Sequence, residues 1–462
     1  MNSYKKDHVI VIWILSTPRV IPFLGGLGLL GSILLLDAVA PASRGLGQVD
    51  SRTAAVPYGP VDGGLRVSSS CEMDGGARIE AVFARWTDLL RNREALPLTD
   101  YERGAEEILA EIFAIDGMSA EILGSRWGSV QEYERQQFRD SLVRALRNVF
   151  LPYFESQREL PTLRPAAEEW AVVGGSVLVR YWLVTSEWSE WFTLRLSGID
   201  GSCKIFDVWK GDRAVLGSLR NRVNRELDDY SFPYMIAELG EYDSVILEDF
   251  EDDEEGSIPY GWTWRDQDKD KNKPYRVRVE SGNHYLEATD EGESVILGKD
   301  IRWNLGDFPY ISFRVRIIRI PEGGDERDDR RVDSAAGVYI TLKKKFFGRI
   351  PESVKYVWSS TLPVGAAVRR RGIGRPWQVV FGSGEEGLGE WRTYVFDLRE
   401  AYEDTFGGDS PSRSVGIGVL SDANSLDSQQ AYADYDDIRA LRTAPEGVSS
   451  GVFEIMAPLR SR

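Results

Sequence analysis

The stretch FAIDGMSAEILGSRWGSVQEYERQQFRDSLVRALRNVFLPYF, residues 113–154, predicts the structure around which the chain is organised. Ser129 and Glu132 match an S-x-x-E capping box, which predicts a helix that begins there with its first backbone donors satisfied. Apolar residues then recur at helical spacing, at Phe138, Leu142, Leu146, Val149 and Tyr153. The opposite face is charged, so another element must cover the apolar side of this helix.

Shorter helices and then strands are predicted around this segment. Helices are expected at 77–92 and 101–113, and a third opens at Ile115 and stops near Gly124. Beyond Pro165 the apolar period changes from helical to alternating, which predicts strands. These fall at 170–173, 177–184, 191–196 and 204–209, and a helix follows at 215–227. Helices followed by an antiparallel meander indicate an α+β domain in which a curved sheet closes over the helices.

Length and charge limit the function classes. A chain of 462 residues is too long for one ordinary core and predicts two folded domains with additional segments. A net charge of −17 argues against a nucleic-acid partner, because the phosphate backbone would repel it. The second domain is expected at 245–443, and residues 444–462 form a C-terminal tail.

Scarce histidines and cysteines exclude several kinds of site. The two histidines, His8 and His284, cannot build a multi-histidine metal site, and they leave little room for Ser-His-Asp or Cys-His catalysis. The scarcity of histidine and cysteine does not exclude glycosidase chemistry, because that chemistry requires only two carboxylates. Cys71 and Cys203 are too few for a disulfide framework and leave open a single bridge in an oxidising compartment.

The N-terminal region indicates export. Residues 1–42 contain two apolar runs, 9–15 and 20–36, and end in A-x-A sites of the signal-peptidase type. The alternative is a retained anchor in the inner membrane, since the second run approaches the ~20 residues needed to span a bilayer. Both readings predict a periplasmic or exported protein. Residues 43–75 are rich in Gly, Ser, Pro and Asp, which is typical of a flexible linker.

From residue 245 onward, short alternating segments are punctuated by Gly, Asp and Asn. About ten strands are expected, at 275–280, 285–288, 294–297, 311–318, 338–342, 354–358, 377–381, 392–397, 415–420 and 433–439. This pattern predicts an all-β sandwich, with the jelly roll as the leading form.

The helical and meander part resembles a known family. The residues that carry the resemblance are Ile115-Asp116, Met118, Leu123-Gly124, Trp127, Phe138, Tyr153, Lys204 to Val208, Gly211 and Leu219-Arg220. Over residues 76–240 it is similar to the MlaC-like family of periplasmic phospholipid-binding proteins, also called toluene-tolerance auxiliary proteins. Cys203 stands where that family usually has Trp, and Leu194 replaces a Tyr of the preceding strand.

That resemblance implies an apolar cavity for the acyl chains of a phospholipid or other lipid. The residues that would line it are Phe138, Leu142, Leu146, Val149, Leu178, Phe192, Leu194 and Phe206. The alternative is that the same stripe fills an ordinary closed core.

The second half also has a family resemblance. It rests on the segments 355–360, 389–392, 406–408, 416–418, 421–424 and 435–438. Together these resemble a bacterial family of unknown function with a galactose-binding-like jelly roll. The resemblance implies a fold and no chemistry.

Acidic residues at the ends of the sandwich suggest a structural calcium. If the first and last strands are neighbours, six carboxylates gather, from Glu248, Asp249, Glu251, Asp434, Asp436 and Asp437. Ca²⁺ takes six to eight oxygen ligands. The alternative is a set of solvated strand ends. No other cofactor is expected.

A glycan site is predicted around Trp358 as an aromatic platform, with hydrogen-bonding side chains from Arg314, Asp422 and Asn424. The alternative is that Trp358 belongs to the core. Two basic islands, 343–345 and 369–371, are solvated loops or contacts for anionic glycans or phosphate headgroups.

The leading functional prediction is an exported, non-enzymatic binding protein. It binds or shuttles lipid in the cell envelope, and its jelly roll binds a glycan or an envelope protein. One alternative is a polysaccharide-active enzyme with two carboxylates about 5 to 10 Å apart in a cleft. The other is a structural envelope protein with no ligand.

Overall fold

The computed structural model describes residues 75–173, 176–199, 202–264, 274–345, 348–425, 429–446 and 454–456. The predicted signal or anchor at 1–42, nearly all of the linker and most of the C-terminal tail lie outside these residues. So does Cys71, and with it the single disulfide bridge that the sequence left open. No helix in the described part of the chain has the length and hydrophobicity that a membrane span requires.

The chain divides into two compact units. The first comprises Met1–Tyr101, Glu111–Ala114 and Val149–Val215, and the second comprises Glu102–Ala110, Ile115–Asn148 and Leu216–Arg462. The division passes through three helices, α4 (Leu98–Ile112), α6 (Glu132–Glu155) and α7 (Val215–Asp229). The domain limits expected from the sequence, 76–240 and 245–443, stay predictions.

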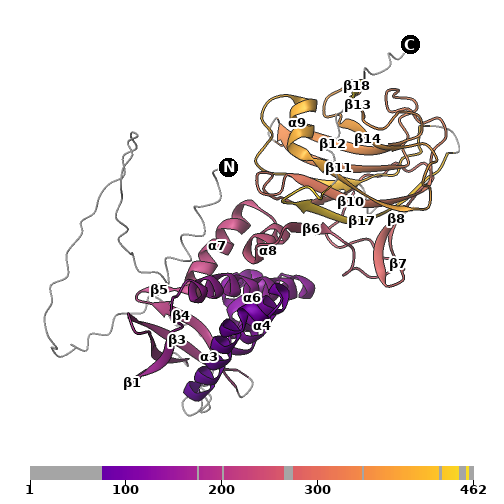
Figure 1. The fold of residues 1–462 in the computed structure, drawn as a ribbon. Coiled ribbons are helices and arrows are strands. Elements are labelled where there is room, and N and C mark those ends of the chain that lie inside the picture. Colours follow the sequence, from indigo (N-terminus) through magenta and orange to yellow (C-terminus); the bar gives the residue numbers. More distant parts are fainter. Residues whose placement is uncertain are drawn as a thin grey trace, which may run out of the picture. The chain divides into compact units, whose positions relative to one another are not determined.

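The helices, labelled as in Figure 1, agree with most of the predicted ones. They are α3 (Gly75–Arg91), α4 (Leu98–Ile112), α5 (Ile115–Leu123), α6 (Glu132–Glu155), α7 (Val215–Asp229), α8 (Phe232–Gly240) and α9 (Leu398–Phe406). The sequence interpretation omitted α8 and α9. Asp397 caps α9 by accepting hydrogen bonds from the backbone N–H groups of Arg399 and Glu400.

The predicted start of the long helix α6 is wrong by two residues. The Ser129 hydroxyl donates to the Arg126 carbonyl at 2.9 Å and so belongs to the preceding 3-10 turn. The helix begins at Glu132, and the backbone N–H of Gln131 donates to Glu134 Oε2 at 3.0 Å. A Gln131–Glu134 pair therefore supplies half of a capping box, displaced from the Ser129–Glu132 pair that the motif indicated.

The first sheet is the predicted antiparallel meander. Its strands follow chain order, as β1 (Thr162–Val173), β2 (Ser176–Val184), β3 (Ser189–Ile199), β4 (Ser202–Lys210) and β5 (Arg213–Ala214). β1 begins well before the predicted residue 170. It is an edge strand, and its register shifts between Pro165 and Trp170, so the proline is accommodated where no neighbour needs its N–H.

Helix α3 packs against β1 and β4 within the first unit. Near the end of α6, the Phe154 ring packs edge-on against Phe83 and Trp86 of α3. Helices packed on an antiparallel sheet give the α+β arrangement expected from the order of elements.

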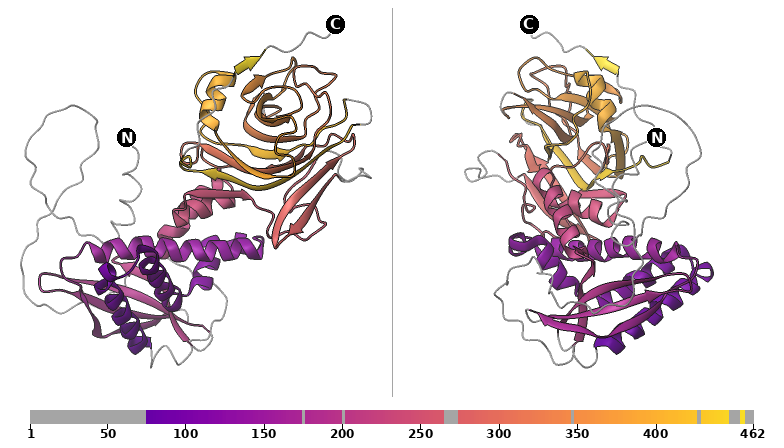
Figure 2. Two further views of the ribbon diagram at one scale, coloured as in Figure 1. Left: turned by 45° about the vertical axis from the view of Figure 1, so that its right-hand side comes forward. Right: turned by 90° about the vertical axis from the view of Figure 1, so that its left-hand side faces the viewer.

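The second half is a two-layer β-sandwich (Figure 2). The six-stranded sheet has the order β15-β10-β17-β8-β7, with β6 also paired to β17. It contains β6 (Ser244–Glu248), β7 (Tyr275–Glu280), β8 (Asn283–Asp290), β10 (Tyr310–Arg319), β15 (Trp391–Asp397) and β17 (Ala431–Leu441). The pairing of β6 with β17 confirms that the first and last long strands of the sandwich lie side by side.

The seven-stranded sheet has the order β18-β13-β14-β12-β11-β16-β9. It contains β9 (Leu297–Asp300), β11 (Ala336–Lys345), β12 (Ile350–Ser359), β13 (Ala366–Val368), β14 (Trp377–Ser383), β16 (Gly416–Val419) and β18 (Glu454–Met456). Each of the ten predicted strands has a counterpart in one of the two sheets, and β7 has the predicted bounds. A two-sheet sandwich of this kind fits the predicted jelly roll.

The sandwich core follows from strand alternation. Phe313 from β10 and Tyr356 from β12 are fully buried, and the Tyr356 ring stacks on Phe396 of β15 at 4.2 Å between centroids. Neighbouring residues along each strand then face outward. Helix α8 joins this core through Tyr234, whose hydroxyl donates to Asp307 Oδ2 at 2.9 Å.

Candidate functional site: a groove on the seven-stranded sheet

A groove of about 790 Å³ lies on the outer face of the seven-stranded sheet. Its floor is formed by the neighbouring strands β9, β16, β11, β12 and β14. Alternation places Val338 and Ile340 of β11 in the core, and it turns Tyr339 toward the groove. Gly298, Gly416 and Gly418 line the floor on β9 and β16, so a ligand can approach the backbone there without meeting side chains.

Lys355 on β12 lies in this groove and is only 2% exposed. Its Nζ donates to Ser334 Oγ at 3.1 Å and lies 5.5 Å from the centre of the Tyr339 ring. Gly337 gives the side chain room, because a Cβ at that position would come within 2.4 Å of Lys355 Cε. Burial lowers the pKa of Lys355, and nearby carboxylates oppose this shift. An ammonium has three donors, and Ser334 accepts from one of them.

Asp422 lies beside Lys355. Its backbone is hydrogen-bonded to Ser334, the residue that also accepts a hydrogen bond from Lys355. The backbone N–H of Asp422 donates to the Ser334 carbonyl at 3.0 Å, and the Ser334 N–H donates back at 3.1 Å. Asp422 is 6% exposed, and its Oδ1 atom is buried without a hydrogen-bond partner in the described part of the chain. A buried carboxylate oxygen with no donor is rare in a folded protein, and it indicates a place where a ligand donates.

Glu326 lies close to the same cluster and is completely buried. Its Oε2 atom accepts from Ser359 Oγ at 2.6 Å, while its Oε1 atom has no partner among the described residues. Burial raises the pKa of Glu326 to about 7, opposed by the Ser359 hydrogen bond and by Lys355. Perturbed, partly satisfied titratable groups beside a groove are the usual physical signature of a binding site.

The other end of the groove is basic and open. Lys344 and Arg375 line it, and both are exposed. Gly374, next to Arg375, approaches Pro351, which is the strand partner of Lys344. Lys344 Nζ lies 4.0 Å from Asp300 Oδ1, but both side chains are exposed, so water screens this pair.

Charge in the groove is opposite in sign to that of the whole chain. The groove is lined by five cationic residues, Lys299, Lys344, Lys355, Arg370 and Arg375, and by two carboxylates, Asp300 and Asp422. The chain as a whole carries −17. Lys299 pairs with Glu248 and Arg370 pairs with Asp329, so Lys344, Lys355 and Arg375 are the groove cations that can attract an anionic ligand.

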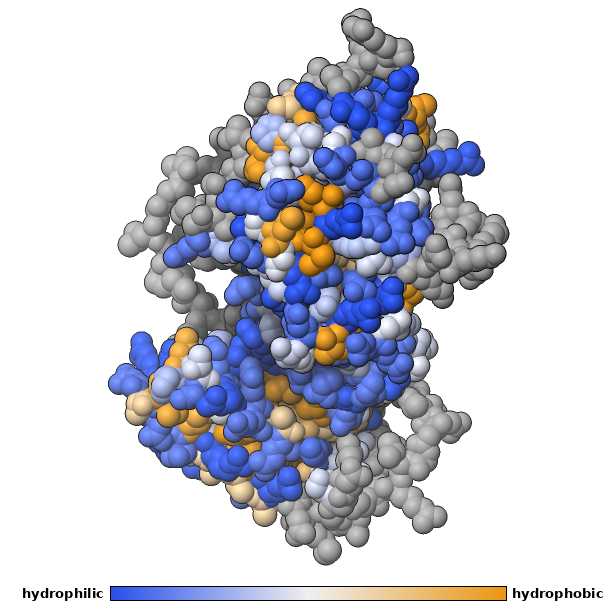
Figure 3. Space-filling view, turned by 90° about the vertical axis from the view of Figure 1, so that its right-hand side faces the viewer, coloured by the Kyte–Doolittle hydropathy of each residue, from blue (hydrophilic) through white to orange (hydrophobic). Residues whose placement is uncertain are grey.

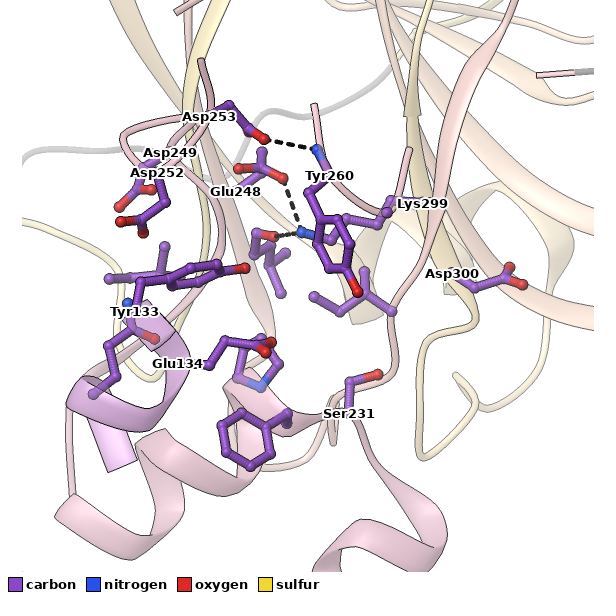
Figure 4. A pocket seen from close by; sticks show the side chains of 17 residues that line it. Tyr133, Glu134, Ser231, Glu248, Asp249, Asp252, Asp253, Tyr260, Lys299 and Asp300 are labelled. Atoms are coloured by element: carbon purple, nitrogen blue, oxygen red, sulfur yellow. Dashed lines mark hydrogen bonds and ion pairs between the residues drawn. The ribbon is translucent and has the colours of Figure 1, made fainter. Parts of the chain in front are cut away.

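A smaller pocket of about 210 Å³ lies nearby, between the start of α6, α8 and the loop after β6 (Figure 4). Burial raises the pKa of Asp253 to about 6, while the N–H of Tyr260 donates to its Oδ1 at 2.7 Å and opposes the shift. Figure 4 shows Lys299 reaching into the pocket, where its Nζ contacts Glu248 Oε2 at 2.8 Å. The lysine of this pocket is thus already neutralised, so the larger groove is the stronger candidate site.

The predicted glycan platform at Trp358 is wrong. Alternation along β12 places its ring on the same side as Tyr356, in the core, where it is 2% exposed. Its Nε1 atom donates to the Gly384 carbonyl at 2.9 Å, so its polar end is satisfied internally. A ring without an exposed face cannot stack on a sugar.

The other three predicted glycan residues do not form one site. Arg314 belongs to the six-stranded sheet, where it pairs with Asp436 at 3.1 Å. Asn424 is exposed and does not line the groove. Asp422 alone lies in the groove. The aromatic surface there is Tyr339, which the sequence interpretation missed because its strand has no distinctive motif.

The five predicted calcium ligands other than Asp249 have hydrogen-bond donors or cations of the protein as partners. Glu248 accepts from Lys299 and Trp262, and Glu251 from the His284 N–H. On the six-stranded sheet Asp434 pairs with Arg316, Asp436 with Arg314, and Asp437 with Arg439. Among the described residues no group of three or more Asp, Glu, His or Cys side chains is placed to hold a metal ion. The calcium stays a prediction that this geometry does not favour.

The predicted lipid-facing helix residues are buried. Phe138, Leu142 and Leu146 have no exposed area, and Val149 is half-buried. Phe138 stacks near Phe232 of α8 at 6.1 Å between centroids. None of the eight predicted cavity residues lines the groove or the smaller pocket.

The four predicted cavity residues of the first sheet cannot share one face. Leu178 is the strand partner of Arg195, whose guanidinium lies over the Phe206 ring at 4.5 Å. Phe192 and Leu194 alternate with Arg195 along β3 and face the other side of the sheet. A cavity on the face of Leu194 would therefore exclude Leu178, which corrects the predicted set.

Comparisons with known proteins found one family model and several solved structures that are similar to parts of this chain. A family model described as a protein of unknown function (DUF3047) matches residues 261–439. No curated protein sequence matches the chain. Similar solved structures include a phospholipid-binding protein from Ralstonia solanacearum, with 12% identity, 35% of this chain and 88% of that chain covered, and a TM-score of 0.29.

Two further solved structures are similar to the sandwich. A family 30 carbohydrate-binding module of a Clostridium thermocellum cellulase has 13% identity, covers 40% of this chain and 87% of its own, and has a TM-score of 0.20. A xyloglucanase domain of a Sinorhizobium fredii effector has 10% identity, covers 40% and 94%, and has a TM-score of 0.24.

Proposed function

We propose that the chain is a non-enzymatic binding protein whose groove on the seven-stranded sheet holds an oligosaccharide. The observation that carries this proposal is the pair formed by Lys355 and Asp422 on either side of Ser334. The lysine offers donors, and the aspartate offers an acceptor without a partner. Adjacent sugar hydroxyls both donate and accept, so one monosaccharide can satisfy both groups.

The floor of the groove suits an extended chain of sugars. Tyr339 is half-buried in it, beside a floor that the glycines keep free of side chains. Between Tyr339 and Lys344 the strand β11 rises about 17 Å, at about 3.4 Å per residue, which leaves room for several sugar units.

Binding is favoured over hydrolysis by the spacing of the groove's carboxylates. Asp300 is the strand partner of Gly416, and Asp422 lies six residues farther along the chain. An extended segment of that length covers roughly 20 Å, whereas paired glycosidase carboxylates stand about 5 to 10 Å apart. Asp300 is also almost fully exposed, which gives it no means of acting as a buried acid.

Isothermal titration of the full chain against a panel of oligosaccharides tests the proposal. We expect micromolar to millimolar binding of at least one of them, and Tyr339→Ala to weaken it. The matched control is Tyr285→Ala on the other sheet, which should bind as the parent does. If no oligosaccharide binds, or if both variants lose binding equally, the groove is not the site.

Lipid binding by the α+β part is a second candidate function. It is supported by the meander β1–β5 with α3 against it, and by the buried apolar residues Val177, Leu194 and Leu196 on one sheet face. Native mass spectrometry of the purified chain, with and without solvent extraction, tests it. A chain that carries no lipid and takes up no labelled phospholipid would exclude this function.

Location in the cell envelope is part of the same proposal. It rests on the apolar runs and A-x-A sites at the N-terminus. Osmotic-shock fractionation of a tagged chain, with N-terminal sequencing of the product, separates a cleaved exported form from a retained anchor. A full-length chain found only in the cytoplasm would contradict it.

A further inference from the structure

The exposed surface outside the groove offers weaker sites. On the face shown in Figure 3, hydrophilic residues predominate and apolar ones form small separate patches. The large exposed apolar side chains that do not line the groove are likewise spread along the sequence, at Leu96, Leu98, Trp182, Tyr260, Val279, Ile318, Val364 and Ile373. No partner of stated chemistry is indicated by these residues.

We infer that the oligosaccharide held in the groove is acidic, with sugar-ring carboxylates as its charged groups. This inference rests on the proposed function, and it names the class of sugar that the groove selects. It follows from two features at opposite ends of the groove. At one end, Asp422 can accept a hydrogen bond from a ligand hydroxyl. At the other end, the exposed Lys344 and Arg375 can bind a ligand anion.

The Asp422 end limits the ligand to one that carries hydrogen-bond donors. Asp422 Oδ1 is a buried acceptor without a partner, so a phosphate or sulfate oxygen placed there would meet a like charge. A sugar hydroxyl donates to it at no such cost. Lys355 is hydrogen-bonded to Ser334 beside it, and its remaining donors suit an acceptor on the same sugar.

The Lys344 end supplies the anion-binding groups. The side chains of Lys344 and Arg375 are exposed at the groove, and Arg375 has no ion-pair partner among the described residues. Arg370 also lines the groove, but Asp329 neutralises it at 2.7 Å. Lys344 and Arg375 are therefore the cations that remain for a ligand, and a planar carboxylate matches the fork of an arginine.

A ligand that binds at both the Asp422 end and the Lys344 end of the groove must carry hydroxyls and carboxylates on the same molecule. Uronic-acid oligosaccharides have this combination, with a carboxylate on each ring and free hydroxyls beside it. A neutral oligosaccharide leaves the cations unused. A simple polyanion leaves Asp422 unpaired and repels it.

The test compares each acidic oligosaccharide with its own methyl ester. The probes are oligogalacturonate, oligoalginate and hyaluronan oligosaccharides, each native and methyl-esterified, with dextran sulfate as a polyanion without carboxylates. Isothermal titration of the full chain at 50 and 300 mM NaCl should show at least one native uronate binding at least tenfold tighter than its ester. Its affinity should fall with salt.

Charge reversal locates the anion-binding groups. Lys344→Glu combined with Arg375→Glu should remove the preference for the native uronate over its ester. Lys343→Glu is the matched control, because it makes the same change on the same strand at a residue that does not line the groove. It should leave the preference in place.

The outcomes separate the inference from the proposed function. Equal affinity for the native sugar and its ester overturns the acidic ligand but keeps the oligosaccharide groove. Dextran sulfate binding as tightly as the uronates overturns the requirement for sugar-ring carboxylates. If none of the probes and none of the neutral oligosaccharides binds, both the inference and the proposed function fall.

Discussion

The outer faces of the two sheets of the sandwich both carry cations, carboxylates and aromatic rings. The two faces differ in whether these groups already pair with one another. On the six-stranded sheet, the Arg316 guanidinium lies over the rings of Tyr285 and Trp391, at 5.1 and 4.7 Å from their centroids, and its Nε contacts Asp434 Oδ2 at 2.8 Å. Arg314 pairs with Asp436 in the same way. On the seven-stranded sheet, the residues that the structure describes give the buried Lys355 one hydrogen-bond acceptor and give Asp422 Oδ1 no donor.

This difference teaches that charge and aromatic content do not by themselves mark a binding surface. The six-stranded sheet has more of both, but its cations, carboxylates and rings already satisfy one another. The seven-stranded sheet has fewer, and they are left partly unsatisfied beside an open groove. Unmade hydrogen bonds of buried groups are costly, so they persist where a ligand completes them.

The largest effect on stability is expected from breaking the Arg316–Asp434 ion pair on the outer face of the six-stranded sheet. Arg316→Met leaves Asp434 buried without its cation, and removing one partner of a buried pair costs about 3 to 5 kcal/mol. Urea denaturation measures this loss, while oligosaccharide binding should not change. Arg276→Met, which breaks an exposed pair with Glu287, is the control and should cost less than about 1 kcal/mol. Equal costs for the two variants would show that Arg316 does not neutralise Asp434.

The next effect is a change in the pH dependence of stability. The pKa of Glu326 is about 7 in the folded chain against an ordinary 4.5, so the folded state binds a proton that the unfolded state releases. Stability from this group is present below pH 4.5 and is lost as pH rises toward 7. Glu326→Gln removes that loss and should be more stable than the parent at pH 8 by up to about 3 kcal/mol, at about 1.4 kcal/mol per pKa unit.

Thermal unfolding at pH 5 and pH 8 measures this difference. The advantage of Glu326→Gln should shrink at pH 5, because the glutamate is then mostly protonated in the folded chain. Glu385→Gln, at an exposed position, should follow the parent at both values. An advantage that is the same at both pH values would show that titration of Glu326 is not its cause.

Removal of the groove's buried cation should affect binding more than stability. Lys355→Met keeps most of the side-chain volume over Gly337 and removes a charged donor. Hydrogen bonds to charged groups contribute about 1.5 to 3 kcal/mol, so oligosaccharide affinity should fall roughly 10- to 100-fold. Titration calorimetry and the melting temperature at pH 7 are measured together, with Lys343→Met as the control. Unchanged affinity with a lowered melting temperature would make Lys355 a structural residue.

The smallest effect on oligosaccharide affinity is expected at Trp391, on the outer face of the six-stranded sheet. Trp391→Ala should change oligosaccharide affinity less than twofold, because its ring is already covered by Arg314 and Arg316. The same titration on Tyr339→Ala gives the contrast. A loss at Trp391 that exceeds the loss at Tyr339 would move the binding site to the six-stranded sheet.

Much of the fold followed from local sequence patterns. The alternation of 275–280 predicted β7 with its observed bounds, and the periodicity through Phe138, Leu142 and Leu146 predicted the buried face of α6. The sequence predictions were wrong where contacts outside the matched motif determine the role of a residue. Ser129 matched a capping motif, but the neighbouring turn uses its hydroxyl, and Trp358 had the composition of a glycan platform but faces the core.

The candidate site was only partly visible in the sequence. Asp422 and the basic islands at 343–345 and 369–371 were singled out, and the groove contains Asp422, Lys344 and Arg370. Lys355 and Tyr339 gave no signal, because a lysine and a tyrosine on alternating strands are ordinary surface residues. Their burial depends on Gly337 and on the 326–334 segment.

The sequence alone determined most of the elements of this protein, with α8 and α9 among the exceptions, and it showed that an acidic chain contains two basic islands. Those properties depend on residues a few positions apart, within the range of helical and strand periods. Only the tertiary structure decided which polar groups satisfy each other. Arg316 and Asp434 lie 118 residues apart along the chain and meet, while Asp422 Oδ1 meets no donor. Pairing of that kind is set by strand order and register, which bring distant segments together through the packing of the whole sandwich.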